Sequence, residues 1–260
     1  MADLKTNGLP AGLNVLLPGV PGSTSRGYLG YCAVTLFTLD GKGEWGLFDT
    51  GHYSDRNLLL SALNKAGIEP TDIRHVVLSH LHFDHILNLP LFPRAEVYVS
   101  QAEIDYAEQV AAGSTVDHAV PDFWEFLLWN RSIHRVEKEH ELGPNCRLTV
   151  RPGHTPGGIV MLCKESEITA VCGDVIKNAW EAVSGKAAMA ASAQDAAESI
   201  RVVMAQAEVI IPGHDRPFRH FQGGLEFLSP FQWEVRTNLY PEPLNNPVLV
   251  MERIAARHLY

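Results

Sequence analysis

The stretch Ser79-His80-Leu81-His82-Phe83-Asp84-His85 places three imidazoles and one carboxylate in the order His-x-His-x-Asp-His. Imidazole and carboxylate groups bind zinc and other divalent first-row metals. The alternative is a polar surface loop that happens to be rich in histidine. Residues 75–79 are mainly β-branched and apolar, as in a buried strand, and residues 86–89 resemble the start of a buried helix. Titratable groups at such a position are costly unless a partner neutralises them, so the stretch predicts a metal site.

The size and composition of the chain indicate a globular protein, for which we expect a small-molecule substrate rather than nucleic acid. Its 260 residues suit one large α/β domain or two small ones. Apolar residues make up 46% of the chain, which is enough for a sizeable core and argues against disorder. The formal net charge of -9 argues against nucleic acid as a partner, because phosphate binding needs clustered Lys and Arg. A homodimer stays open.

The cysteines and the N-terminus bear on where the protein resides. None of the four cysteines forms a C-x-x-C pair, the spacing of zinc knuckles and redox motifs. Cys163 and Cys172 lie in apolar runs, where cysteine usually acts as a small buried hydrophobe. The N-terminus lacks a basic start followed by an apolar stretch, and no apolar run approaches the roughly 18 residues that span a bilayer. We therefore expect a cytoplasmic protein without a membrane partner.

Strands and amphipathic helices alternate along the chain. Predicted strands cover residues 31–39, 44–49, 73–78, 95–99, 148–151, 159–163, 168–172 and 209–211. Predicted helices cover residues 55–66, 101–112 and 195–206. Gly41-Lys42-Gly43 is expected to form the hairpin turn between the first two strands. This order predicts a layered α/β domain in which helices cover the outer faces of packed sheets.

Three further turns, each directly after an apolar strand, carry a potential metal ligand. Residues 152–158 place His154 in a turn rich in Gly and Pro, residues 171–174 end with Asp174, and residues 211–215 contain His214. Each motif alone is weak, because a lone Gly-His is more often a plain turn and a lone Gly-Asp is usually a helix cap or an Asx-turn. Together with the histidine-rich stretch, they predict that four strand ends converge on one site.

This set of motifs resembles the metallo-β-lactamase superfamily. The His-x-His-x-Asp-His stretch is followed by His154, Asp174 and His214 in that family's order, and Phe48-Asp49-Thr50-Gly51 resembles the family's upstream Asp-Thr-Gly turn. The resemblance runs from about residue 30 to residue 216. It implies an α/β fold of the αββα type, with two mixed sheets packed face to face and helices outside. Residues 1–260 would form a single domain, with residues 217–260 as a C-terminal extension packed on the core.

The resemblance also assigns roles to the candidate ligands. His80, His82 and His154 would hold a first metal ion. Asp84, His85 and His214 would hold a second one. Asp174 would bridge both ions together with a water or hydroxide, and Asp84 could orient that hydroxide. Asp49 is either an acceptor that fixes the tautomer of a ligand or a plain turn former.

The chemistry of such a centre is that of a dinuclear hydrolase. A pair of divalent ions, zinc first with manganese or iron as alternatives, would sit at roughly 3.5–4 Å from one another. The pKa of a water bound between them falls from about 15.7 toward about 7, which provides hydroxide at neutral pH. No serine nucleophile is then needed, and the Gly-x-Ser-x-Gly motif is absent from the sequence.

Within the superfamily, residues 98–103 and 213–215 resemble the N-acyl-homoserine-lactone lactonases. Those enzymes place a Tyr three residues after the bridging Asp, where it can polarise the substrate carbonyl. Here that position is Lys177, which could supply the charge for an oxyanion or could face solvent. Residues 88–93 and 212–218 resemble a further group of metallo-β-lactamase-domain hydrolases with diverse substrates.

We therefore expect hydrolysis of a carboxylic ester, with a lactone as the first choice. Cleavage of a thioester or a phosphodiester at the same centre is one alternative, and a metal-binding protein without hydrolytic activity is another. Residues 113–140 are rich in aromatic side chains and form either a helix on the core or a substrate lid. The expected apolar pocket is lined by Tyr28, Phe83, Trp124, Trp129 and Trp180, with Arg26 beside Tyr28 on an early Gly-rich loop.

Overall fold

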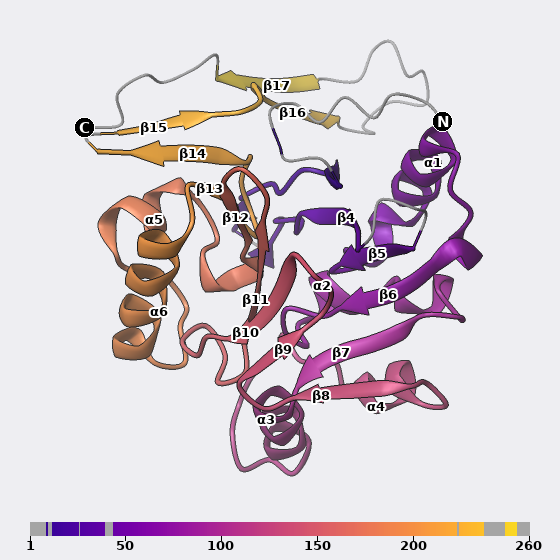
Figure 1. Cartoon of the computed structure of the whole chain (residues 1–260). Helices are drawn as coiled ribbons and strands as arrows, with labels where there is room; N and C mark the ends of the chain where they lie inside the picture. The colour runs from indigo at the N-terminus through magenta and orange to yellow at the C-terminus, as the bar shows by residue number, and fades with distance from the viewer. Residues whose placement is uncertain are drawn as a thin grey trace.

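The computed structural model describes residues 9, 12–25, 27–39, 44–222, 224–236 and 248–253. Two mixed β-sheets pack against one another, and helices cover their outer faces (Figure 1). The predicted α/β sandwich of two mixed sheets is therefore confirmed. The predicted turn at residues 41–43 and Arg26 lie outside the described residues.

The first sheet contains the strand that leads into the histidine-rich stretch. Its order is β1 (Leu13–Leu17), β4 (Val34–Thr38), β5 (Trp45–Phe48), β6 (Ile73–Val77), β7 (Glu96–Ser100) and β8 (Ile133–Val136). The strands from β5 to β8 run parallel, whereas β1, β4 and β5 pair antiparallel. Because parallel neighbours end at the same edge, the turns after β5, β6 and β7 are brought together there.

The second sheet supplies the other three strand ends. Its order is β15 (Gly224–Phe227), β14 (Phe218–Phe221), β13 (Val209–Ile211), β12 (Ile168–Val171), β11 (Ile159–Lys164), β10 (Cys146–Val150) and β9 (Glu139–Glu141). Strands β12 and β13 pair parallel, so the turns that follow them lie side by side. The β10–β11 hairpin pairs antiparallel and carries residues 151–158 at the same end.

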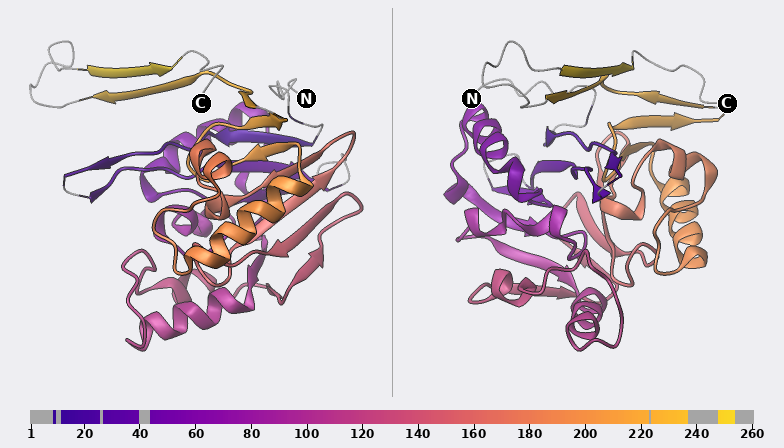
Figure 2. Two further views of the ribbon diagram at one scale, coloured as in Figure 1. Left: turned by 90° about the vertical axis from the view of Figure 1, so that its left-hand side faces the viewer. Right: turned by 180° about the vertical axis from the view of Figure 1, so that it is seen from behind.

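Helices cover the outer faces of both sheets. Figure 2 shows α5 and α6 on the side of the second sheet and α1, α3 and α4 on the side of the first. The helices are α1 (Arg56–Ala66), α2 (Phe83–Ile86), α3 (Gln101–Ala111), α4 (Trp124–Leu128), α5 (Ala179–Ser184) and α6 (Ala193–Gln206). Side-chain caps start several of them: Ser100, Asn178 and Ser192 each accept a hydrogen bond from a backbone N–H of the first turn.

Alternating side chains of each strand enter different cores. In β6 and just after it, Val76 and Leu78 pack into the core between the first sheet and its helices, whereas Val77 packs between the two sheets. Leu148 and Met161 face Val77 from the second sheet in that central core. Strands buried on both faces read as continuous apolar runs, which explains the sequence pattern before the histidine-rich stretch.

The sequence did not indicate two features of the structure, a disulfide bond and the strands of the C-terminal region. Cys163 is buried as predicted, but it is joined to Cys146 by a disulfide across directly opposed positions of β10 and β11. In the C-terminal region, β14 and β15 extend the second sheet, and β16 (Phe231–Arg236) pairs with β17 (Val248–Arg253) in a separate hairpin (Figure 2). Within the described ranges, no helix has the length and apolar character needed to cross a bilayer.

Candidate metal centre

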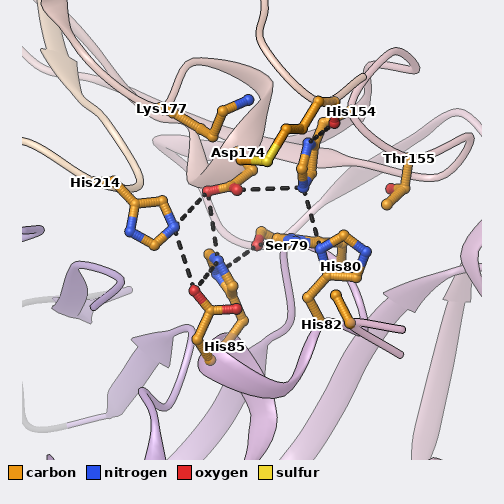
Figure 3. A network of polar contacts seen from close by, with 12 residues as sticks. Ser79, His80, His82, His85, His154, Thr155, Asp174, Lys177 and His214 are labelled. Carbon is orange, nitrogen blue, oxygen red and sulfur yellow. Dashed lines mark hydrogen bonds and ion pairs between the residues drawn. The ribbon is translucent and has the colours of Figure 1, made fainter. Parts of the chain in front are cut away.

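The predicted ligands converge at one edge of the sandwich (Figure 3). His80 and His82 lie in the turn after β6, and α2 carries Asp84 and His85. The second sheet contributes three residues: His154 between β10 and β11, Asp174 on the 3-10 turn Gly173–Val175 after β12, and His214 after β13. The structure thus brings together all seven residues that the sequence predicted as metal ligands.

Two groups of three donors can each hold one cation. His80, His82 and His154 have donor atoms within 4.8 Å of one another, and so do Asp84, His85 and His214. Asp174 joins the two groups: its Oδ2 lies 3.2 Å from His154 Nε2, and its Oδ1 lies 3.1 Å from His214 Nε2. This placement is the one expected of a bridging carboxylate.

Each of the five imidazoles has an inner ring nitrogen, which faces the other candidate ligands, and an outer ring nitrogen, which faces away from them. The outer nitrogen of each imidazole contacts an oxygen atom. Four of the five contacts go to oxygens that can only accept from an N–H, and the fifth goes to the hydroxyl of Ser79, whose own proton goes to Asp49. The contacts are His80 Nδ1 to Ser79 Oγ (2.9 Å), His82 Nε2 to Asp117 Oδ2 (2.9 Å), His85 Nδ1 to Asp49 Oδ2 (2.8 Å), His154 Nδ1 to the Met189 carbonyl (3.0 Å) and His214 Nδ1 to the Tyr31 carbonyl (3.0 Å). In the neutral imidazoles, the inner nitrogens therefore carry lone pairs.

These inner lone pairs face one another or face carboxylates, which is unfavourable without a cation. His154 Nε2 lies 3.1 Å from His82 Nδ1. Among the residues that the structure describes, His80 Nε2, His85 Nε2, His214 Nε2 and Asp174 Oδ1 are buried without a hydrogen-bond partner. Buried polar atoms are rarely left in this state, and nitrogen and carboxylate donors in this number suit two divalent first-row metal ions. The residues present therefore fit the predicted pair of ions.

The pKa values of the clustered side chains also favour the binding of cations. Burial lowers the pKa of His154 to about 3, so its imidazole is neutral at pH 7. Burial also opposes protonation of His214, but the nearby carboxylates of Asp174 and Asp84 outweigh it and raise the pKa of His214. Burial raises the pKa of Asp174, yet the imidazoles of His214, His154 and His85 hold it well below its usual range. The carboxylates thus favour positive charge at the centre.

Asp49 accepts hydrogen bonds from Ser79 and from the candidate ligand His85. Its Oδ1 accepts from the backbone N–H of Ser79 (2.7 Å), and its Oδ2 accepts from the Ser79 hydroxyl (2.8 Å) as well as from His85. Its φ of 60° places it in the left-handed region, which a short polar side chain that bonds locally tolerates. One buried carboxylate therefore orients both the start of the histidine-rich turn and one ligand.

Two carboxylates of α3 and the segment after it were not found from the sequence. Asp117 accepts from His82 Nε2, from the Tyr106 hydroxyl (2.8 Å) and, at its other oxygen, from the backbone N–H of Ala119 (2.9 Å). Glu103 accepts from the backbone N–H of Leu81 (3.0 Å) and from the hydroxyl of Thr155 (2.6 Å), the residue after His154. No local pattern marks either residue, because their partners lie far away in the sequence.

Lys177 is buried rather than facing solvent. Its Nζ donates to the carbonyl of Ala188 (2.8 Å) and lies 3.0 Å from Glu181 Oε1. In Figure 3 its side chain extends away from the carboxylate of Asp174. Glu181 also accepts from the backbone N–H of Ala188 (2.9 Å), next to the Met189 carbonyl that contacts His154. Lys177 and Glu181 therefore hold the segment that orients a ligand.

The predicted pocket residues lie in three places. Tyr28 contacts His214, and Phe83 begins α2 beside the metal ligands. Trp180 lies on α5 and is half exposed. Trp124 is buried in the outer core of the first sheet, whereas Trp129 is exposed; the two line a pocket of about 560 Å³ together with Ile104, Glu108, Glu125, Phe126, Leu128, Ile133 and Arg135. None of the seven predicted ligands lines that pocket.

Comparisons with known proteins give a consistent result. Residues 27–214 match the sequence profile of the Metallo-beta-lactamase superfamily. The chain is 28% identical over 221 residues to "Metallo-beta-lactamase domain-containing protein 1" of Xenopus laevis, which covers 80% of this chain and 86% of that protein. It is 30% identical over 104 residues to an N-acyl homoserine lactonase of a Bacillus species, covering 40% and 38% of the two chains. AidC, a dizinc quorum-quenching lactonase, has a similar fold, with a TM-score of 0.60, 20% identity and coverage of 77% and 80%.

Proposed function

The chain belongs to the metallo-beta-lactamase superfamily of metal-dependent hydrolases, and we propose that it hydrolyses a carboxylic ester, a lactone first of all, at a centre of two divalent ions. Zinc is the first candidate for both ions. The observation that carries the proposal is the set of inner imidazole nitrogens that face one another and the carboxylates of Asp84 and Asp174 across 3.1–3.4 Å.

The residues divide into two sets of ligands around Asp174. His80, His82 and His154 would hold one ion, and Asp84, His85 and His214 would hold the other. When bound, two such ions would supply an activated water as the nucleophile and would polarise the ester carbonyl. Asp84 Oδ2 lies 3.4 Å from His214 Nε2 and 3.8 Å from His85 Nε2, so this carboxylate lies among the ligands, where it could orient that water.

Two further observations favour an ester over a phosphodiester. Lys177 is paired with the buried carboxylate of Glu181 and therefore offers no free positive charge to a phosphate. The residues that border the ligands toward solvent, Tyr28 and Phe83, are aromatic and suit a substrate with an apolar part. The similarity to a Bacillus N-acyl homoserine lactonase supports the lactone within this class.

A substrate panel combined with metal analysis tests the proposal. The protein expressed with added zinc should contain about two metal equivalents and should hydrolyse lactones faster than thioesters or bis-p-nitrophenyl phosphate. His154→Ala should lose metal and lower kcat/KM by at least about 10²-fold, because a ligand is removed. His134→Ala, a change at a half-exposed histidine outside the centre, is the matched control and should keep both. Retained lactone turnover in a metal-depleted His154→Ala protein would contradict the mechanism.

A further inference from the structure

Tyr28 brings a phenol to the metal centre from a part of the chain that supplies no ligand. It lies in β3 (Gly27–Tyr28), which pairs with β2 (Ser23–Thr24) in a short hairpin. Its Oη is 3.0 Å from His214 Nδ1, and its ring meets the His214 imidazole edge-on with centroids 5.5 Å apart. Tyr28 is 42% exposed, whereas His214 is 2% exposed. The phenol therefore stands between a buried ligand and solvent.

The proton of this phenol is not used by His214. His214 Nδ1 also lies 3.0 Å from the carbonyl oxygen of Tyr31, which can only accept a hydrogen bond. The nitrogen must then carry the proton, and it donates to Tyr31 and to Tyr28 Oη as a shared hydrogen bond. Since Tyr28 accepts in this contact, its own O–H remains free to donate in another direction. The same tautomer leaves His214 Nε2 free for a metal ion.

The backbone beside Tyr28 is shaped to let the ring lie over the centre. A Cβ atom added at Gly30 would lie 2.3 Å from both Cζ and Oη of Tyr28. The phenol therefore rests directly on Gly30, whose φ is outside the left-handed region, so that Ala is compatible with the backbone there. Any side chain at position 30 would displace the phenol from its present position.

The residue that the sequence suggested for the same task is already engaged. The Nζ of Lys177 is bound to the Ala188 carbonyl and to Glu181, and its side chain extends away from Asp174 (Figure 3). Tyr28 is exposed and contacts the buried His214, so it lies on the solvent side of this ligand. The phenol thus has a free proton and is held at the outer nitrogen of one ligand, two properties that suit an oxyanion donor at the rim of the centre.

From this arrangement we infer that Tyr28 is a catalytic residue whose O–H donates a hydrogen bond to the carbonyl oxygen of the ester as negative charge develops on it. The inference rests on the proposed ester hydrolysis and adds a donor to it. In this mechanism Asp84 and Asp174 would position the attacking water, while Tyr28 would donate a hydrogen bond to the acyl group of the substrate. The hydroxyl keeps its proton throughout, so that the phenol acts as a hydrogen-bond donor and not as an acid.

Kinetics of Tyr28→Phe on the zinc-loaded protein test this role. The change removes only the hydroxyl and should lower kcat for a lactone by about 10²-fold with little change in KM, because the hydrogen bond strengthens only in the transition state. Gly30→Ala should lower kcat in the same direction, since it displaces the phenol without removing it. Tyr53→Phe is the matched control: Tyr53 is an exposed phenol outside the centre, and its removal should leave kcat unchanged.

Two measurements besides turnover separate this role from mere support of His214. The zinc content of Tyr28→Phe should equal that of the parent protein. In calorimetric titrations, an alkyl phosphonate that mimics the tetrahedral oxyanion should bind Tyr28→Phe about as much more weakly as kcat/KM falls, whereas the carboxylate product should lose little affinity. Turnover within about two-fold of the parent, or loss of zinc in parallel with turnover, would overturn the inference. If the parent protein itself hydrolyses no ester or lactone, the proposed function has failed instead.

Discussion

Asp49 Oδ2 accepts a hydrogen bond from His85 Nδ1 at 2.8 Å, although the two residues lie 36 positions apart in the chain. Asp49 ends β5 and His85 lies on α2 after β6, so the contact joins the turns that follow two parallel neighbouring strands. The same carboxylate also accepts from the backbone N–H and the hydroxyl of Ser79. Asp49, at the edge of the first sheet, thus orients the imidazole of His85, a candidate metal ligand.

Asp49→Asn should weaken metal binding more than it alters the fold. An amide offers one acceptor oxygen instead of two and cannot stabilise the positive charge that His85 shares with a bound ion. We expect zinc affinity to fall by about 10–100-fold, the usual effect of removing a carboxylate partner of a metal ligand. Competition with a chromophoric chelator measures the change. Asp122→Asn, at an exposed position, serves as control, and an unchanged zinc affinity in Asp49→Asn would contradict this role.

Asp117→Asn and Tyr106→Phe should have graded effects on the same quantity. His82 differs from the other four imidazoles because its Nε2 faces outward to Asp117 and its Nδ1 faces the centre. Loss of the carboxylate should lower zinc affinity by about 10–100-fold, and loss of the Tyr106 hydroxyl, which only supports Asp117, should lower it less. Equal effects, or none, would show that the carboxylate does not set the tautomer of His82.

The metal-free protein should lose stability as the pH falls below about 6.5, in part through His154. Burial lowers the pKa of His154 to about 3, so between these values the unfolded chain takes up a proton that the folded chain does not. The folded state therefore loses free energy relative to the unfolded state on acidification. For His154 alone the loss between pH 7 and pH 5 is roughly 2 kcal/mol. Urea unfolding of metal-free parent and His154→Gln proteins at both pH values measures it, and the parent should show the steeper decline.

Lys177→Met should destabilise the protein without abolishing metal binding. The change leaves the carboxylate of Glu181, which is fully buried, without its cation, a loss that costs about 3–5 kcal/mol in buried ion pairs. Chemical denaturation should show this decrease, while Lys186→Met at an exposed position should stay within about 0.5 kcal/mol of the parent. A stable Lys177→Met protein that binds zinc but hydrolyses no lactone would instead assign the ammonium group to catalysis.

The convergence of the candidate ligands could be predicted from the sequence because each lies in or near a short turn that follows an apolar strand. The carboxyl ends of parallel strands meet at one edge of a sheet, and four ligand-bearing turns of the same kind therefore suggested one common site. His154, Asp174 and His214 owe their positions to β10, β12 and β13, which are recognisable as apolar runs. The fold class follows from the same alternation of strands and helices.

The partners of the ligands could not be predicted, because they depend on tertiary contacts. Asp117 lies 35 positions from His82, and no periodic pattern connects them. The partners of His154 and His214 are backbone carbonyls, which every residue possesses. The positions of Trp124 and Trp129 could not be predicted either, because aromatic side chains suit both a core and a substrate pocket. The structure places them on the outer face of the first sheet, away from the candidate ligands.

The seven ligands come from both halves of the sandwich, four from turns of the first sheet and three from turns of the second. Each of the two proposed ions would take ligands from both sheets and would join them at their open rim, where Glu103 already connects Leu81 to Thr155. Binding of these ions would then stabilise the contact between the two halves, because a ligand that binds only the folded state shifts the folding equilibrium toward it. A chelator would act on this protein as a mild denaturant as well as an inhibitor.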